Sequence, residues 1–149
     1  MKVSNRPGDT IVTHSLGSCI AVVIHDPDAE VAGLLHFQLP DSKSNPDRAS
    51  DNPYMYADTG IPLLFKSAYK LGAEKKRMIV KVVGGSNVLD RNGFFSIGER
   101  NYVATRKILW KNGVFIDAED VGGESWRTVR VEVATGRMLV KNSERTFEL

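Results

Sequence analysis

The chain has 149 residues, 42% of them hydrophobic, which fits one globular domain (residues 1–149) with a core of its own. Its 20 basic and 18 acidic residues are interspersed and give a net charge of +2, which argues against a nucleic-acid-binding surface. The longest apolar run, residues 20–24, is far too short for a transmembrane helix, and residues 1–9 contain no apolar stretch of a signal sequence. A single cysteine cannot form an internal disulfide, so we expect a cytoplasmic protein without direct membrane insertion.

The first third of the chain predicts three strands, at residues 10–14, 20–25 and 31–37. Each segment is short, rich in β-branched residues and bounded by turn residues. The sequence Asp-Pro-Asp-Ala at residues 26–29 is a good turn, so the second and third strands are expected to form a β-hairpin.

The long connection between Leu39 and Ala57 is polar, rich in proline, and shows neither helical nor strand periodicity. A connection of this length in a compact domain is either a functional lid or a disordered surface insertion, and both interpretations remain open. Its position directly after His36 makes the lid the interpretation to test.

Two amphipathic helices are predicted at residues 58–71 and 97–112, because apolar residues recur on one face of each and glycine follows each end. Asp58 is the expected N-cap of the first helix. Four more strands are expected at residues 78–83, 114–118, 128–133 and 138–141, the last two as a hairpin with its turn at 134–137. Residues 142–149 resemble a frayed tail.

Seven strands and two main helices exclude a strict alternation of strand and helix along the chain. We therefore expect an α/β fold of layered, mixed β-sheets, similar to a β-sandwich, with the two helices packed on one face.

Cys19 is the only cysteine, and it stands at the turn between the first two predicted strands. Gly17 allows a positive φ and a sharp bend, which aims the N–H groups of Gly17, Ser18 and Cys19 into one pocket. Such N–H groups hold the oxyanion of acyl chemistry, so Cys19 is a candidate nucleophile. The alternative is that Cys19 is a small buried hydrophobic residue, which is the commoner role of a free cysteine.

His36 is the candidate base. If the hairpin turn is centred between Pro27 and Asp28, Cys19 lies directly opposite His36 on the neighbouring strand, with both side chains on one face. A thiol within reach of a histidine is an activated nucleophile. The inference depends on the register, because a change in the turn or a bulge alters the pairing, and an accidental pairing of the two residues remains the main alternative.

The predicted hairpin also limits the roles of the other two histidines and of Thr13. His25 falls at its turn end and His36 at its open end, so a metal site built from all three histidines is excluded. His25 is expected to be an exposed strand-end residue, and His14 either a neighbour of the site or a surface residue. Thr13 is a candidate to orient the imidazole, although a purely structural threonine is the commoner finding in a strand.

Residues 84–87, Gly-Gly-Ser-Asn, resemble a phosphate loop but lack its lysine and its spacing, which argues against nucleotide binding. A tight turn that brings Ser86 and Asn87 to the end of the sheet is the better interpretation. Gly85, Ser86 and Asn87 are therefore candidates for a wall of the site.

Several segments, taken in order along nearly the whole chain, make it similar to the CheD family of chemotaxis proteins. Residues 16–19 (Leu-Gly-Ser-Cys) with Thr13 resemble the nucleophile motif of that family, and residues 33–37 (Gly-Leu-Leu-His-Phe) resemble its histidine motif. The other matching segments are residues 80–87, 97–101, 118–123 and 135–137.

The resemblance implies a deamidase that converts selected glutamines of methyl-accepting chemoreceptors to glutamate through a cysteine thioester. It implies a triad of Cys19, His36 and Thr13, no metal or cofactor, and a fold similar to that of bacterial toxin deamidases. The implied partners are the helical bundle of the receptor and the CheC phosphatase, with a monomer when free. The alternatives are a non-catalytic module that binds receptors or CheC, and a cysteine peptidase or transferase outside chemotaxis.

Overall fold

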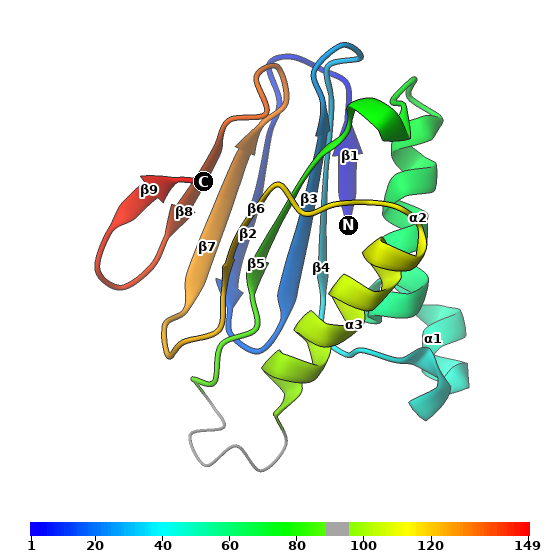
Figure 1. Cartoon of the computed structure of the whole chain (residues 1–149), viewed down its shortest axis with the longest axis vertical. Helices are drawn as coiled ribbons and strands as arrows, with labels where there is room; N and C mark the ends of the chain where they lie inside the picture. The colour runs from blue at the N-terminus through cyan, green and yellow to red at the C-terminus, as the bar shows by residue number, and fades with distance from the viewer. Residues whose placement is uncertain (89–95) are drawn as a thin grey trace.

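In the computed structural model, which describes residues 1–88 and 96–149, a five-stranded sheet lies between a four-stranded sheet and a layer of helices (Figure 1). The central sheet has the strand order β1-β4-β3-β5-β6, and the outer sheet the order β2-β7-β8-β9. All neighbouring strands are antiparallel except β5 and β6. The central strands are β1 (Lys2–Ser4), β4 (Val31–Phe37), β3 (Ile20–Asp26), β5 (Ile79–Gly84) and β6 (Ala118–Val121). The outer strands are β2 (Thr10–Leu16), β7 (Arg127–Glu132), β8 (Met138–Lys141) and β9 (Thr146–Glu148).

Strand β3 is buried along its whole length because both faces of the central sheet are covered. Ile20, Val22 and Ile24 belong to the apolar cluster beneath the helices, whereas Ala21 and Val23 belong to the cluster between the two sheets. The period of two along the strand therefore divides its side chains between two cores.

The helical layer covers the face of the central sheet that points away from the outer sheet (Figure 1). Helices α2 (Ala57–Tyr69) and α3 (Ile97–Lys111) begin and end close to the predicted bounds. The mixed α/β fold with its two main helices on one face is confirmed.

The connection before α2 is ordered, so its interpretation as a disordered insertion is wrong. It contains η1 (Ser42–Ser44), α1 (Pro46–Asp51) and η2 (Pro53–Met55), and a parallel bridge joins Leu39 to Tyr56. The carboxylate of Asp58, the predicted N-cap, instead accepts hydrogen bonds from the backbone N–H and hydroxyl of Ser42, at 3.0 and 2.7 Å. The predicted lid function stays a prediction.

Three other parts of the chain differ from expectation. The apolar run at 114–118 is mostly an unpaired connection whose Val114 and Ile116 pack against the helical core, and the strand follows it as β6. Residues 146–148 form β9 on the edge of the outer sheet, where the sequence predicted a frayed tail. Strand β1, which was not predicted, pairs with β4. A further short turn, η3, spans Lys75–Arg77.

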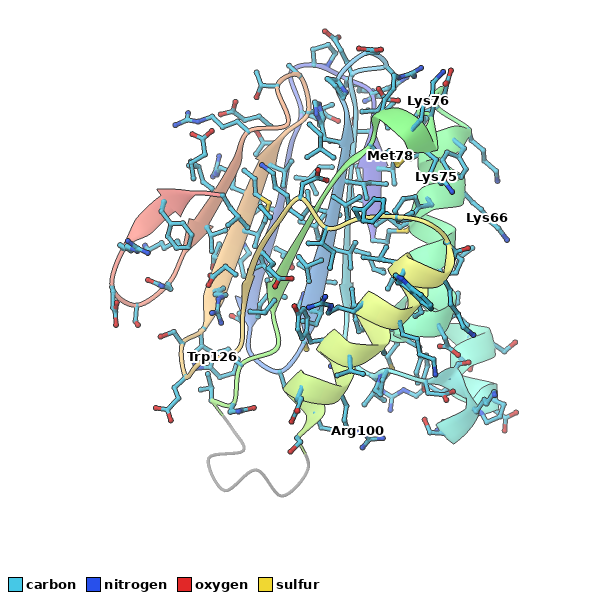
Figure 2. All side chains as sticks on the ribbon, viewed as in Figure 1. Lys66, Lys75, Lys76, Met78, Arg100 and Trp126 are labelled. Atoms are coloured by element: carbon cyan, nitrogen blue, oxygen red, sulfur yellow. The ribbon has the colours of Figure 1, made fainter. Side chains whose placement is uncertain are left out.

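The molecule has two distinct ends. Figure 2 shows Trp126 and Arg100 towards one end of the layers, and Lys75 and Lys76 towards the other. The β2–β3 loop, with Cys19, lies at the end that carries Trp126 (Figures 1 and 2). We call this the Trp126 end.

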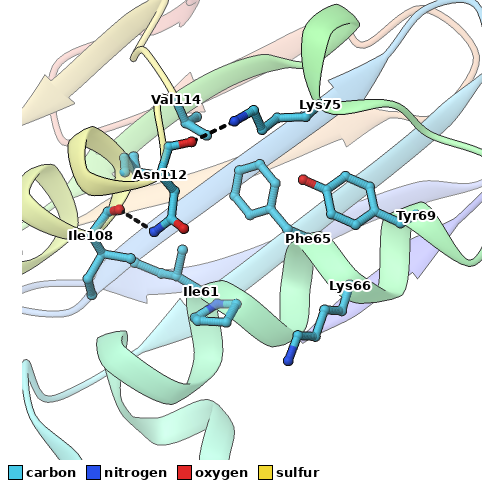
Figure 3. A pocket seen from close by; sticks show the side chains of 10 residues that line it. Ile61, Phe65, Lys66, Tyr69, Lys75, Ile108, Asn112 and Val114 are labelled. Carbon is cyan, nitrogen blue, oxygen red and sulfur yellow. Dashed lines mark hydrogen bonds between the residues drawn. The ribbon is translucent and has the colours of Figure 1, made fainter.

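A cavity of about 200 Å³ lies in the helical layer (Figure 3). It is lined by side chains of α2 and α3, among them Phe65, Tyr69 and Ile108, together with Lys75 and Val114. The cavity therefore lies on the opposite face of the central sheet from the inter-sheet cluster that contains Cys19.

Candidate functional site

Backbone hydrogen bonds fix the loop that carries Cys19. The N–H of Gly85 donates to the carbonyl of Cys19, and the N–H of Ser86 donates to the carbonyl of Gly17, both at 2.8 Å. The side-chain amide of Asn101 donates to the carbonyl of Ser18 at 2.9 Å. The carbonyls of three consecutive residues, the last of them Cys19, are thus held in place, which limits the freedom of the cysteine backbone.

The bend in this loop differs from the predicted one. Ser15 has the positive φ, 57°, at a bulge between Thr13 and Leu16, whereas Gly17 does not. Glycine is needed at position 17 for space, because a Cβ there would lie 2.8 Å from the Trp126 ring. The residue type was interpreted correctly as special, but for the wrong physical reason.

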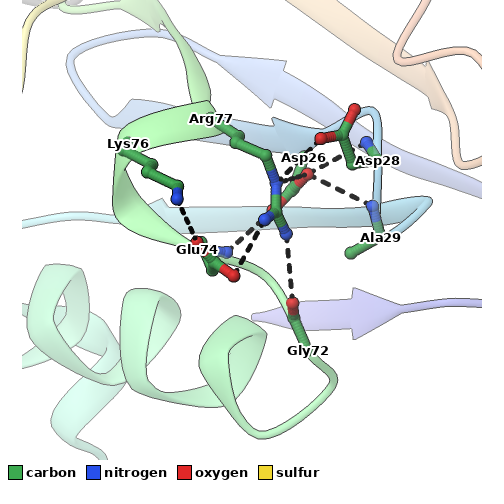
Figure 4. A network of polar contacts seen from close by, with 7 residues as sticks. All are labelled: Asp26, Asp28, Ala29, Gly72, Glu74, Lys76 and Arg77. Atoms are coloured by element: carbon green, nitrogen blue, oxygen red, sulfur yellow. Dashed lines mark hydrogen bonds and ion pairs between the residues drawn. The ribbon is translucent and has the colours of Figure 1, made fainter.

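The register of the β3–β4 hairpin differs from the prediction by two residues. His36 pairs with Ala21, and Asp26 pairs with Val31, so the loop has four residues in place of two. The carboxylate of Asp26 accepts hydrogen bonds from the N–H groups of Asp28 and Ala29 and so stabilises this longer turn (Figure 4). The predicted direct opposition of Cys19 and His36 is therefore wrong.

A shift of two residues preserves the face on which each side chain lies. Cys19 is two residues before Ala21 and packs on the inter-sheet cluster, and His36 alternates with Leu34, which belongs to the same cluster. Cys19 and His36 thus hold diagonal positions across the open end of the hairpin, a relationship in which Cα atoms lie about 7 to 8 Å apart in a regular antiparallel pair.

Thr13 and His36 form a hydrogen bond across the two sheets. The Thr13 hydroxyl lies 2.9 Å from Nδ1 of His36, although 23 residues separate them in the chain. Thr13 belongs to the outer sheet and pairs with Val129, so this bond joins the sheets beside the Cys19 loop. Which of the two groups donates depends on the tautomer of the imidazole.

Burial shifts the pKa of Cys19 and the pKa of His36 in the directions that favour their neutral forms. Burial raises the pKa of the Cys19 thiol, and the backbone N–H of Cys19 offsets part of that effect. Burial, and after it the positive Met1 amino group, lowers the pKa of His36 below its ordinary value of 6.5. At neutral pH the resting pair is therefore a thiol and a neutral imidazole rather than an ion pair.

The three residues predicted as a wall are placed differently from one another. Gly85 and Ser86 are buried behind the Cys19 loop, where their N–H groups are occupied by its carbonyls. Asn87 is exposed, and its N–H donates to the carbonyl of Gly123. Gly85 and Ser86 therefore hold the Cys19 loop from behind, and Asn87 is the exposed residue of the three.

The remaining histidines do not join the site. His25 was expected to be exposed, but it is 4% exposed, and its Nε2 lies 3.1 Å from the carbonyl of Val133 at the end opposite Cys19. His14 is exposed. Across residues 1–88 and 96–149, no group of three or more His, Cys, Asp or Glu side chains is arranged to hold a metal ion.

Asn101 is the residue that the sequence interpretation missed. It is fully buried in the first turns of α3, and its amide group also donates to the carbonyl of Gln38 at 2.8 Å. One side chain therefore ties the Cys19 loop to the segment that follows His36. A polar residue on the apolar side of an amphipathic helix was the available signal, since buried asparagines need partners.

Comparison with known proteins identifies a consistent set of relatives. A family profile described as CheD chemotactic sensory transduction matches residues 38–142, a range that begins just after His36. The probable chemoreceptor glutamine deamidase CheD 1 of Syntrophus aciditrophicus is 56% identical over 142 residues, which cover 95% of this chain and 89% of the relative. The probable chemoreceptor glutamine deamidase CheD 2 of Anaeromyxobacter dehalogenans is 48% identical over 149 residues, 100% of this chain and 94% of the relative.

A more distant relative has the same name. The chemoreceptor glutamine deamidase CheD of Thermotoga maritima is 40% identical over 139 residues, which cover 93% of this chain and 85% of the relative. In the part of the chain that the structure describes, no helix is long and apolar enough to cross a membrane.

Proposed function

The chain belongs to the CheD family of chemotaxis proteins, and from that premise we propose that it is a chemoreceptor glutamine deamidase that converts selected receptor glutamines to glutamate. The observation that carries the proposal is identity of up to 56% across 95% of the chain with a relative of that name. The bond between Thr13 and His36, beside the only cysteine, supports a triad of these three residues.

In the proposed mechanism, Cys19 is the nucleophile and His36 the base. The Nε2 atom of His36 removes the thiol proton as the sulfur attacks the glutamine side-chain carbonyl, which forms a C–S bond and an oxyanion. The imidazolium then gives its proton to the nitrogen, and ammonia leaves as the C–N bond breaks. Water hydrolyses the resulting thioester to glutamate and frees the thiol.

The pKa shifts describe the starting state of this proton transfer. Because burial favours the neutral thiol and the neutral imidazole, His36 has to accept the thiol proton before or during the attack on the substrate. With the proton on Nδ1 and donated to the Thr13 hydroxyl, Nε2 of His36 keeps its lone pair for the thiol. The mechanism uses this tautomer, and the bond to Thr13 orients the ring for it.

Backbone N–H groups at Ser18 and Cys19 are the proposed oxyanion donors. The N–H groups of Gly85 and Ser86 already donate to carbonyls of the loop, so their role is to hold the donors in place. Asn87, which is exposed, is the member of that segment that the proposal places next to substrate.

Several narrower expectations accompany the proposal. The family resemblance supports action in the cytoplasm on the receptor helical bundle, a CheC-type phosphatase as partner, and a monomeric free protein. It also supports a fold similar to that of toxin deamidases, with which the layered sheets and one-sided helices are compatible.

The test is to incubate the protein with a purified cytoplasmic fragment of a chemoreceptor from the same organism and to follow peptides by mass spectrometry. Deamidation adds about 1 Da at particular glutamines. The Cys19→Ala variant is expected to add none, while Lys76→Ala, which changes an exposed lysine at the opposite end of the molecule, is expected to match the wild type. Full activity in Cys19→Ala would exclude the mechanism, and binding without any mass change in the wild type would favour the binding-module alternative.

A further inference from the structure

Trp126 lies against the loop that carries Cys19. It belongs to the connection between β6 and β7, and its ring packs on Gly17 so closely that a Cβ at position 17 would be 2.8 Å from the Cζ3 atom. The side chain nevertheless remains 42% exposed. A large aromatic ring with one side fixed on the backbone of a catalytic loop and the other side open is preorganised for contact with a ligand.

Trp126 also forms one side of a groove of about 470 Å³ at the Trp126 end of the molecule. Its other lining residues come from the end of β2, the start of β7, and the end of β8 with the turn after it, and they include His14, Ser15, Lys141, Asn142 and Ser143. The groove combines one aromatic surface with several polar groups, and Trp126 joins it to the Cys19 loop through its contact with Gly17.

Trp126 and Cys19 are close enough to contact the same short stretch of a helix. Gly17 and Cys19 are two residues apart, so their Cα atoms are separated by at most about 7 Å. The indole, which touches Gly17, is therefore within about 10 Å of the Cys19 backbone. A helix rises 1.5 Å per residue, so a span of at most about 10 Å covers no more than about two turns.

Another exposed aromatic surface lacks this connection. Trp110 and Phe115 are 77% and 82% exposed, but they belong to the end of α3 and the connection after it, in the helical layer. Both residues line a separate pocket formed by α3 and the connection to β6. Trp110 is therefore a matched control for Trp126, and the proposal concerns Trp126 alone.

We propose that Trp126 and its groove bind the receptor helix beside the target glutamine, with the indole packed on an apolar receptor side chain three, four or seven residues away. Residues at these spacings share one face of a helix, so a glutamine that points at Cys19 presents such a neighbour to Trp126. This inference rests on the proposed function, because it takes the receptor helix as substrate. Trp126 is thus a specificity-determining residue, and glutamines that lack the apolar neighbour are poor substrates.

The first experiment measures deamidation of the receptor fragment by Trp126→Ala, Trp126→Phe and the control Trp110→Ala. Trp126→Ala is expected to raise KM about tenfold and to leave kcat within about twofold, as for loss of a single aromatic anchor. Trp126→Phe is expected to lie between Trp126→Ala and the wild type, and Trp110→Ala to match the wild type. Alkylation of Cys19 by iodoacetamide should be the same in all four proteins.

Two results would overturn the proposal. An unchanged KM in Trp126→Ala would show that the ring does not contact substrate. A parallel fall of kcat and of the Cys19 alkylation rate would show that Trp126 only supports the loop at Gly17.

The second experiment separates this proposal from the deamidase function. Binding of the receptor fragment to Cys19→Ala and to Cys19→Ala with Trp126→Ala is compared by calorimetry, which needs no turnover. About tenfold weaker binding in the double variant supports the groove even if the wild type proves inactive, and equal binding rejects it. A receptor fragment with alanine at the apolar position three, four or seven residues from the glutamine should bind the Cys19→Ala protein more weakly than the unchanged fragment. The same receptor substitution should have no further effect on binding to the protein that carries both Cys19→Ala and Trp126→Ala.

Discussion

Burial shifts the pKa values of Cys19 and His36 in opposite directions. It raises the pKa of the Cys19 thiol and lowers that of the His36 imidazole, so the neutral form of each is favoured. An imidazole that stays neutral is available as a base at a lower pH than an exposed one.

The pH dependence of kcat/KM follows from this shift. We expect the acid limb to have a midpoint below 6.5, because His36 must be neutral to accept the thiol proton and its pKa is lowered. Activity is therefore retained as pH falls through 6.5 and is lost at lower pH. Initial rates between pH 4.5 and 8 at constant ionic strength measure the limb. A midpoint above 6.5 would contradict the proposed environment of His36.

Thr13 contributes through one hydrogen bond. Thr13→Val removes the hydroxyl bonded to His36 while it keeps a branched side chain of similar shape, and we expect kcat to fall about fivefold, as for loss of about 1 kcal/mol. Thr13→Ser keeps the hydroxyl and should restore most of the rate. Equal rates in Thr13→Val and the wild type would make the threonine structural.

The residues of the site were predictable to different degrees. Cys19, His36 and Thr13 stand out because a lone cysteine beside glycine and a hairpin with a histidine are visible in sequence, and the Thr13 bond matches that prediction. The register was not predictable, because the four-residue turn depends on hydrogen bonds to Asp26 that involve its three-dimensional neighbours. His25 appears polar in sequence but is buried, since the β7–β8 hairpin covers it and Gly136 packs against its ring.

At the scale of elements, helix α3 contributes to the site through Asn101. This side chain bonds to the carbonyls of Ser18 and Gln38, which belong to the segments that carry the proposed nucleophile and follow the proposed base. The helix thus sets the separation of the two segments although no α3 residue is proposed to touch substrate.

Replacement of Asn101 should therefore affect the rate more than substrate binding. We expect Asn101→Ala to lower kcat roughly 100-fold with little change in KM, because displacement of reacting groups by about 1 Å has such an effect. Asn112→Ala, at the exposed end of the same helix, is the control and should keep full activity. Circular dichroism distinguishes a displaced loop from an unfolded protein. A KM effect with normal kcat would contradict a positioning role for Asn101.

Long elements were better predicted than short ones. Helices α2 and α3 and strands β3, β4, β7 and β8 carry enough residues to show a period, so their ends were placed within a few residues. Strands β1 and β9 have three residues each, and the helical turns between residues 42 and 55 are equally short. Such pieces form because neighbouring strands or side chains hold them, and this information is absent from local sequence.

At the scale of the whole molecule, an ion-pair network stands at the end opposite the site. Asp26, whose side chain is fully buried, accepts hydrogen bonds from the Arg77 guanidinium and from the N–H of Glu74 (Figure 4). Burial alone raises the pKa of Asp26, but these bonds outweigh it and lower the pKa to about 2. The network joins the β3–β4 turn to the segment that connects the helical layer to β5.

Loss of the charge at Asp26 should destabilise the fold. We expect Asp26→Asn to lower the free energy of unfolding by about 1.5 to 3 kcal/mol in urea denaturation at pH 7, as for hydrogen bonds to a charged group. Asp28→Asn, an exposed partner of the same arginine, should unfold like the wild type. The hydrogen bonds to Asp26 stabilise its ionised form, and this is why its pKa is lowered. The wild type should therefore lose this contribution to stability as pH falls from 3.8 towards 2 and the carboxylate becomes protonated. A wild-type and an Asp26→Asn protein of equal stability would contradict this role.

The burial of Cys19 also has a consequence for how the enzyme ages in an oxidising environment. Peroxides react with thiolates far faster than with protonated thiols, so a raised thiol pKa slows conversion of Cys19 to a sulfenic acid. The chain carries no second cysteine that could trap such a sulfenate as a disulfide and permit its repair. The same burial that favours the neutral thiol therefore protects the proposed nucleophile, which the chain has no internal means to restore.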